Sequence, residues 1–277
     1  MSDIPMTLPD RPDQNQSRQA ASVALDGRGD KPGATLRTRL RRSAAGGEMA
    51  LTAELVALCH REVPDPGPDL TRTPMQEDDF SALTATLLAE LGDAPLWVFA
   101  YGSLIWKPEF TSQERRRATA FGWHRAFTMK LDRFRGSEDH PGLMMVLEPG
   151  GRCDGVVFRI DGAEREAAID RLLRREVTSI EYLSSFRWLT TRTDAGRVRA
   201  LCFWCGTAGH ESLHLPPEES AAMLARACGH AGSGAEYLFN TVAHLDAFGI
   251  RDRRLWRLQK LVADEIRKLY PTRISAE

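Results

Sequence analysis

The segment LWVFAYGSLIWKPEF, residues 96–110, leads from an apolar run into a Tyr-Gly-Ser-Leu motif. Residues 96–100 form an unbroken apolar run, whereas a strand with one face in water alternates apolar and polar residues. We therefore predict a strand with both faces covered, which ends inside the molecule. Gly102 has no Cβ, so the chain can turn sharply there and present backbone N–H groups to an anion or oxyanion. An ordinary turn is the alternative, because short motifs often occur by chance.

Composition limits the classes of protein that the chain can be. Its 277 residues are 42% hydrophobic with a formal net charge of −1, which suits one sizeable domain or two small ones. A chain so near neutrality has no excess of positive charge to attract the phosphates of a nucleic acid. Residues 37–43, RTRLRRS, nevertheless form a local basic cluster. The sequence contains no run of 18 apolar residues, so it predicts no membrane span.

The N-terminus and the cysteines predict a cytoplasmic location. The first residues contain no apolar stretch typical of a secretory signal, and aspartates are mixed among their arginines. The cysteines are odd in number and scattered, unlike a disulfide framework, which agrees with a reducing compartment. They are Cys59, Cys153, Cys202, Cys205 and Cys228.

The chain divides into four parts. Residues 1–48 are rich in Pro, Gly, Ser, Asp and Arg without an apolar period, which predicts a disordered leader. Residues 49–95 form an N-terminal helical segment, with helices expected at 51–62 and 77–93 and Gly92 as a C-terminal cap. A domain over 96–270 follows, and 271–277 form a tail.

The domain is expected to belong to the α+β class. Strands are predicted at 116–131 and 143–160, with a hairpin at 149–151 (Pro-Gly-Gly), and a second hairpin over 185–205 turns at 194–196. Helices are predicted at 161–177, 217–228, 233–248 and 252–269, the third with a capping box of Ser233 and Glu236. Clustered strands with helices at both ends suggest a sheet that curls into a small barrel.

Two motifs resemble metal or redox sites. HESLH, residues 210–214, matches the HExxH zinc signature, but nearby glycines and Pro216-Pro217 leave little room for the helix that this signature requires. CFWC, residues 202–205, lies in a predicted strand, where positions i and i+3 point to opposite faces, and no second pair completes a tetrahedral site. We interpret the first as a surface loop and the second as two core thiols.

Two further residues each allow two interpretations. Glu176 follows Arg174 and Arg175 at the end of a predicted helix, where a negative side chain meets the unfavourable end of the helix dipole. It is either a surface glutamate paired with an arginine, or a partly buried carboxylate with a raised pKa that serves as a general base. Tyr237, one turn into a capped helix, either packs in the core or offers its hydroxyl to a site.

Several segments, taken in order and spacing, resemble the ChaC family of γ-glutamylcyclotransferases over roughly residues 50–269. They are LWVFAYGSLIWKPEF, GWHRAF, RFRGSEDHPGLMMVLEPGG, LLRREVTSIEYLSSFRWLTTRT and GSGAEYLFNTVAHLDAFGIRD. Many members have arginine at the position of Leu143 and asparagine near Ser233-Gly234. These departures bear on which γ-glutamyl peptide is the substrate.

The resemblance implies a small mixed β-barrel with surrounding helices, and an enzyme that cleaves glutathione into 5-oxoproline and Cys-Gly. The γ-glutamyl amine attacks its own side-chain amide, without water, metal or other cofactor. Glu176 corresponds to the proton carrier. The implied substrate-binding residues are Val98, Phe99, Ala100, Tyr101, Gly102, Ser103, Leu104 and Tyr237. A non-catalytic regulatory protein of the same fold, associated with cation transport, is the alternative, and a metalloprotease is a second one.

Overall fold

The computed structural model describes residues 47–206 and 210–271. The predicted disordered leader therefore lies outside the described residues except for 47 and 48, and the predicted tail does so except for 271.

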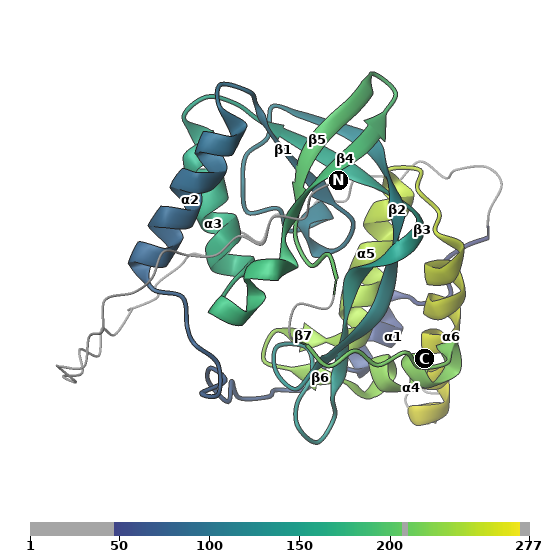
Figure 1. Ribbon diagram of the computed structural model, residues 1–277. Coiled ribbons are helices and arrows are strands. Elements are labelled where there is room, and N and C mark those ends of the chain that lie inside the picture. The colour runs from purple at the N-terminus through teal and green to yellow at the C-terminus, as the bar shows by residue number, and fades with distance from the viewer. Residues whose placement is uncertain (1–46, 207–209, 272–277) are drawn as a thin grey trace, which may run out of the picture.

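The centre of the molecule is a closed five-stranded barrel (Figure 1). Its strands, in spatial order, are β1 (Leu96–Ala100), β3 (Gly142–Ile160), β2 (Glu114–Leu131), β4 (Arg187–Thr193) and β5 (Gly196–Cys202). Neighbouring strands are antiparallel except where β1 and β5 close the barrel in parallel at Val98 and Leu201. The predicted α+β class and mixed barrel are confirmed, and so is the buried strand at 96–100.

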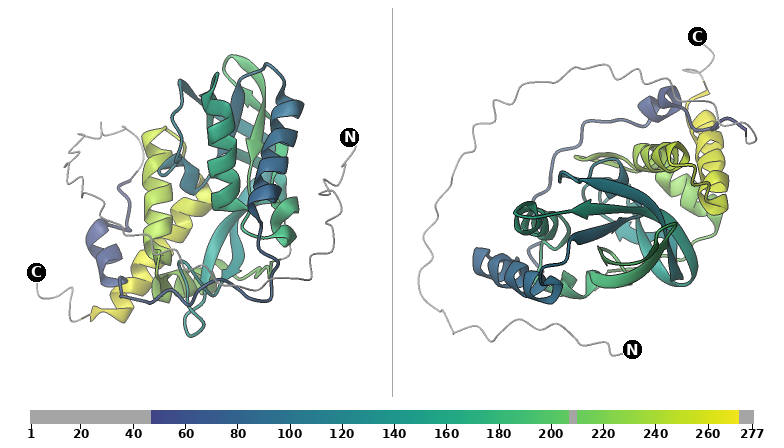
Figure 2. Two further views of the ribbon diagram at one scale, coloured as in Figure 1. Left: turned by 90° about the vertical axis from the view of Figure 1, so that its left-hand side faces the viewer. Right: turned by 90° about the horizontal axis from the view of Figure 1, so that it is seen from above.

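Helices cover the barrel on two sides (Figure 2). On one side, α2 (Glu77–Leu91) lies beside α3 (Glu164–Glu176). On the other side are α1 (Ala53–Leu58), α4 (Pro217–Arg226), α5 (Gly234–Ala247) and α6 (Arg253–Leu269). The tiny sheet of β6 (Cys228–Gly229) and β7 (Gly232–Ser233) precedes α5. All six predicted helices are present, although α1 is shorter than expected because the Thr52 side chain caps its start and it ends before Cys59.

The hairpin predicted at 149–151 is wrong. Strand β3 runs straight through these residues, and its pairing with β2 shifts register between Phe121 and Trp123. Gly150 and Gly151 have φ values of 101° and 72°, which glycine adopts easily. These two residues therefore allow an irregularity within the long β2–β3 ribbon instead of a hairpin turn. The chain reverses instead in the loop 132–141, between β2 and β3. The second predicted hairpin is confirmed, since β4 and β5 pair from Thr193 and Gly196 onward.

Within the described parts of the chain, none of the helices has both the length and the apolar character needed to cross a bilayer.

Candidate active site

The YGSL turn lies where β1 leaves the barrel wall. After Tyr101 and Gly102 the chain enters a short 3₁₀ helix, Ser103–Ile105, and the Ile105 N–H donates to the Gly102 carbonyl at 3.0 Å. A Cβ at Gly102 would lie 3.0 Å from the Tyr237 hydroxyl. Since Gly102 has a φ of −137°, glycine is needed here for space and not for a left-handed backbone.

The apolar face of α3 places Glu176 inside the molecule. Ile169, Leu172 and Leu173 are at most 1% exposed, and Glu176 continues this face at the last residue of the helix. Burying each of the three apolar side chains contributes about 1.5–3 kcal/mol, which helps to offset the cost of burying a carboxylate.

Glu176 is held from two directions. Its Oε2 accepts a hydrogen bond from Trp204 Nε1 at 2.7 Å. Its Oε1 lies 3.0 Å from Arg175 Nε, but the geometry is not that of a hydrogen bond, and this buried oxygen has no hydrogen-bond partner among the described residues. One carboxylate oxygen is thus anchored, and the other keeps free lone pairs.

The pKa of Glu176 is raised above the ordinary value of a glutamate, mainly because burial disfavours the charged form. The positive charge of Arg175 and the hydrogen bond from Trp204 act in the opposite direction, and the negative charge of Glu109 adds to the rise. With its side chain only 10% exposed, Glu176 is not a surface glutamate. Of the two interpretations left open by the sequence, the structure agrees with the buried carboxylate.

Arg175 connects the carboxylate to the YGSL turn. Its Nη2 donates to Ser103 Oγ at 2.9 Å, and its Nη1 donates to the Lys107 carbonyl. The guanidinium also offsets the unfavourable position of Glu176 at the C-terminal end of the helix dipole.

Two tyrosines belong to the cluster, Tyr101 of the turn and Tyr237 of α5. Burial raises the pKa of Tyr237 in α5 to about 12, against a lowering effect of the Ser103 backbone. Tyr101 donates to the carbonyl groups of Phe203 and Trp204 at 3.2 and 3.1 Å, and its pKa is likewise raised by burial. Both hydroxyls are therefore protonated near neutral pH.

Ser233 caps α5 as predicted, whereas the Glu236 carboxylate binds Arg135.

The predicted site residues fall into two groups. Tyr101, Gly102, Ser103, Tyr237 and Glu176 come together, linked by the contacts described above. The other four side chains are buried in the core, so they form the wall that supports the turn. These are Val98, Phe99, Ala100 and Leu104.

Sequence reasoning missed Trp204 and Arg135. Trp204 was passed over as the residue between two thiols, and its contact with Glu176 spans 28 positions. Arg135 comes from the loop between β2 and β3, and its guanidinium lies 5.6 Å from the centre of the Tyr237 ring. Neither contact has a local sequence signal, because each joins elements that meet only in the folded barrel.

The HESLH segment contains no helix, as expected. His210 stacks on Tyr182 with a ring separation of 4.4 Å, while His214 Nδ1 lies 3.6 Å from Glu148. Burial lowers the pKa of His210 to about 4, so its ring is neutral near pH 7. Over 47–206 and 210–271, no three His, Cys, Asp or Glu side chains are grouped to hold a metal ion.

The CFWC segment is only partly a strand, which corrects the prediction. Strand β5 ends at Cys202, and Trp204 has a left-handed backbone with a φ of 57°. Both cysteines are fully buried free thiols, as predicted.

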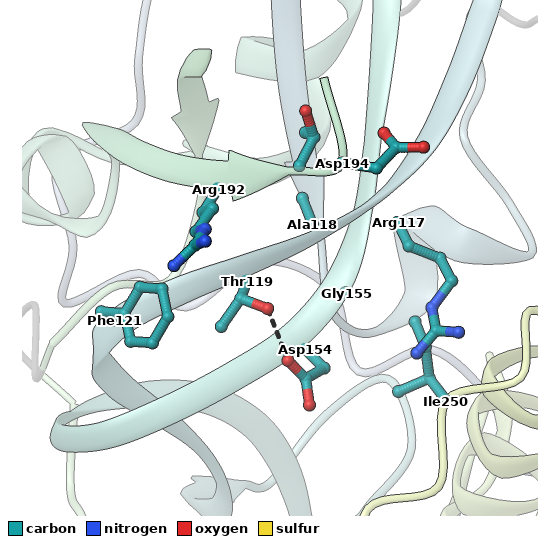
Figure 3. A pocket seen from close by; sticks show the side chains of 10 residues that line it. Arg117, Ala118, Thr119, Phe121, Asp154, Gly155, Arg192, Asp194 and Ile250 are labelled. Atoms are coloured by element: carbon teal, nitrogen blue, oxygen red, sulfur yellow. Dashed lines mark hydrogen bonds between the residues drawn. The ribbon is translucent and has the colours of Figure 1, made fainter. Parts of the chain in front are cut away.

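A cavity of about 330 Å³ lies elsewhere, beside the β4–β5 turn (Figure 3). Arg117, Thr119, Asp154 and Arg192 line it, and Thr119 Oγ1 donates to Asp154 at 2.6 Å. Its lining shares no residue with the cluster around Glu176, so it is not the site that the sequence predicts.

Comparisons with known proteins place the chain in a family. The profile of the ChaC-like protein family matches residues 96–265. The glutathione-specific γ-glutamylcyclotransferase of Escherichia coli (strain K12) is 34% identical, over 64% of this chain and 76% of that protein. Glutathione-specific γ-glutamylcyclotransferase 1 of Danio rerio is 31% identical, over 53% and 77%. The crystal structure of a yeast γ-glutamyl cyclotransferase specific to glutathione shares the fold, with a TM-score of 0.54 and 20% identity over 62% of this chain and 96% of that one. The chain therefore belongs to the ChaC-like protein family.

Proposed function

We propose that this protein is a γ-glutamylcyclotransferase that cleaves glutathione into 5-oxoproline and Cys-Gly, with Glu176 as the proton carrier. The observation that carries the proposal is a buried carboxylate beside Arg175, which links it to the YGSL turn: one oxygen is anchored by Trp204, and the other is ion-paired but accepts no hydrogen bond from the described residues. Family membership supports it, because the E. coli and Danio rerio relatives are named for this activity.

The reaction needs one proton carrier and no water. Glu176 takes a proton from the γ-glutamyl ammonium, and the free amine attacks the side-chain amide carbon. A five-membered lactam forms as the bond to the cysteinyl nitrogen breaks. The two protons that the amine loses end on this nitrogen, so the products are 5-oxoproline and Cys-Gly. Because the nucleophile is tethered to its target, proximity supplies much of the rate acceleration.

The surrounding groups suit the charges that develop. The Tyr237 hydroxyl lies against Gly102 of the turn and stays protonated near neutral pH, so it can donate to a substrate carboxylate or a developing oxyanion. Arg175 keeps a positive charge beside Glu176, so it favours the ionised, proton-accepting carboxylate. We place the reaction in the cytoplasm, and the five free, buried thiols agree with a reducing compartment.

A non-catalytic regulator of the same fold is the second candidate. Such a protein requires no general base, and burial of a carboxylate costs stability, here offset only in part by Arg175 and Trp204, without return. The buried state of Glu176 therefore favours the enzyme.

The test is a substrate panel. Purified protein is incubated separately with glutathione, γ-Glu-Cys and γ-Glu-Ala, and 5-oxoproline is measured by mass spectrometry. We expect release from glutathione well above that from the two dipeptides. Equal rates on all three would remove the glutathione specificity, and no release from any of them would contradict the activity.

A further inference from the structure

Trp204 lies outside the YGSL turn and the Arg-Glu pair, and it touches the candidate base directly. Its indole N–H donates to Glu176 Oε2 at 2.7 Å, and Trp204 lies beyond the end of β5, far from α3 in sequence. This hydrogen bond anchors one carboxylate oxygen while the other has no hydrogen-bond partner among residues 47–206 and 210–271.

The backbone of Trp204 is strained and firmly held. A φ of 57° is uncommon for a bulky residue, and such conformations concentrate at functional sites. Its carbonyl accepts from the Leu147 N–H at 2.8 Å and from the Tyr101 hydroxyl at 3.1 Å. These two bonds, from β3 and from the turn itself, hold the peptide in the conformation that directs the indole toward Glu176.

Aromatic rings hold the indole from the other side. Tyr182 and His210 lie with their ring centres 5.4 and 5.1 Å from Trp204, both near edge-to-face, and they stack on each other. His210 is uncharged near neutral pH, so this support adds no charge next to the carboxylate.

We propose that Trp204 is a positioning residue, whose indole N–H fixes the Glu176 carboxylate in the orientation required for proton transfer. This inference rests on the proposed function of Glu176. A hydrogen bond to the ionised form also favours that form, so the indole limits the rise in pKa that burial causes. The other groups that act on Glu176 are Arg175 and Glu109, and the hydroxyls of Tyr101 and Tyr237 lie near it.

The experiment removes the N–H and keeps the ring. Trp204→Phe is made together with a protein that carries benzothienylalanine at 204, in which sulfur replaces the N–H at nearly the same size. Trp188→Phe is the matched control, because Trp188 also donates its N–H to a glutamate, Glu90, at 2.6 Å, away from the site. We measure kcat and KM for glutathione against pH, and the titration of ¹³C-labelled glutamate carboxyls by NMR, with the Glu176 signal assigned by its loss in Glu176→Gln.

Both Trp204 variants should lower kcat about tenfold with little change in KM, and move the acidic limb of the rate profile up by about one pH unit. The Glu176 carboxyl signal should shift its titration in the same direction, while Trp188→Phe leaves both unchanged. A wild-type pH profile and an unshifted carboxyl titration in the benzothienylalanine protein would overturn the proposal, even if Trp204→Phe loses stability. If wild-type protein releases no 5-oxoproline, the proposed function fails, but the carboxyl titration still decides the role of Trp204.

Discussion

Two tryptophan–glutamate hydrogen bonds among the described residues have nearly equal lengths but different surroundings. Trp204 donates to Glu176 at 2.7 Å, and Trp188 donates to Glu90 at 2.6 Å. The Glu90 side chain is 39% exposed and also pairs with Arg199, whereas that of Glu176 is 10% exposed. Burial raises the pKa of Glu176. The same hydrogen bond is therefore a surface contact at Glu90 and the anchor of a candidate general base at Glu176.

The largest difference between the two glutamates is expected in turnover when each is changed separately to glutamine. Glutamine keeps the size of the side chain but cannot accept a proton near neutral pH. Glu176→Gln should lower turnover of glutathione by about 10²–10⁴-fold, the usual contribution of a general base, while the melting temperature changes little. Glu90→Gln should leave turnover unchanged. Near wild-type 5-oxoproline release from a folded Glu176→Gln protein would exclude Glu176 as the proton carrier.

The raised pKa of Glu176 should also be visible in the pH dependence of the rate and of the stability. Glu176 must be ionised to accept a proton, and its pKa is raised by burial, so kcat/KM should rise tenfold per pH unit up to a limb above the ordinary glutamate value. Because the folded state binds this proton more tightly than the unfolded chain does, the free energy of unfolding should fall as pH rises from the ordinary to the raised pKa.

Urea unfolding across this pH window checks the linkage. In Glu176→Gln the fall in the free energy of unfolding that is due to Glu176 should disappear, and in Glu90→Gln it should remain. An identical pH dependence of stability in the wild type and in Glu176→Gln would mean that the pKa of Glu176 is not raised.

The two arginines before Glu176 provide a smaller contrast. Arg175 faces the turn and the carboxylate, whereas Arg174 pairs on the surface with Glu77 and Asp170. Arg175→Gln should reduce kcat/KM about tenfold and raise the acidic limb, because a positive charge beside the base is lost. Arg174→Gln should change neither. Steady-state kinetics on both variants decide, and equal effects would show that Arg175 has no special relation to the site.

The smallest effect is expected at the turn. In Gly102→Ala the new Cβ would press on the Tyr237 hydroxyl, which should raise KM a few-fold and cost about 1 kcal/mol of stability. Gly47→Ala is the control, since a Cβ there meets nothing within 4 Å. Kinetics and urea unfolding of the two proteins measure both quantities. Unchanged values in Gly102→Ala would show that the turn tolerates a side chain.

Periodicity predicted the parts of this fold that depend on local pattern. The apolar run at 96–100 and the apolar face of α3 are visible in the sequence, but this local pattern leaves open whether Glu176 is buried or lies on the surface. Pro149-Gly150-Gly151 was misread because glycines that permit positive φ serve a strand irregularity as readily as a turn. Trp204 could not be predicted, because its contact depends on a left-handed backbone held by Tyr101 and β3.

The most direct test of the account is the fate of glutathione in ¹⁸O-labelled water, followed by mass spectrometry with wild-type protein. Ring closure by the tethered amine uses no water, so 5-oxoproline and Cys-Gly should appear in a one-to-one ratio, both without ¹⁸O. Release of ¹⁸O-labelled glutamate, or the absence of any product, would contradict it.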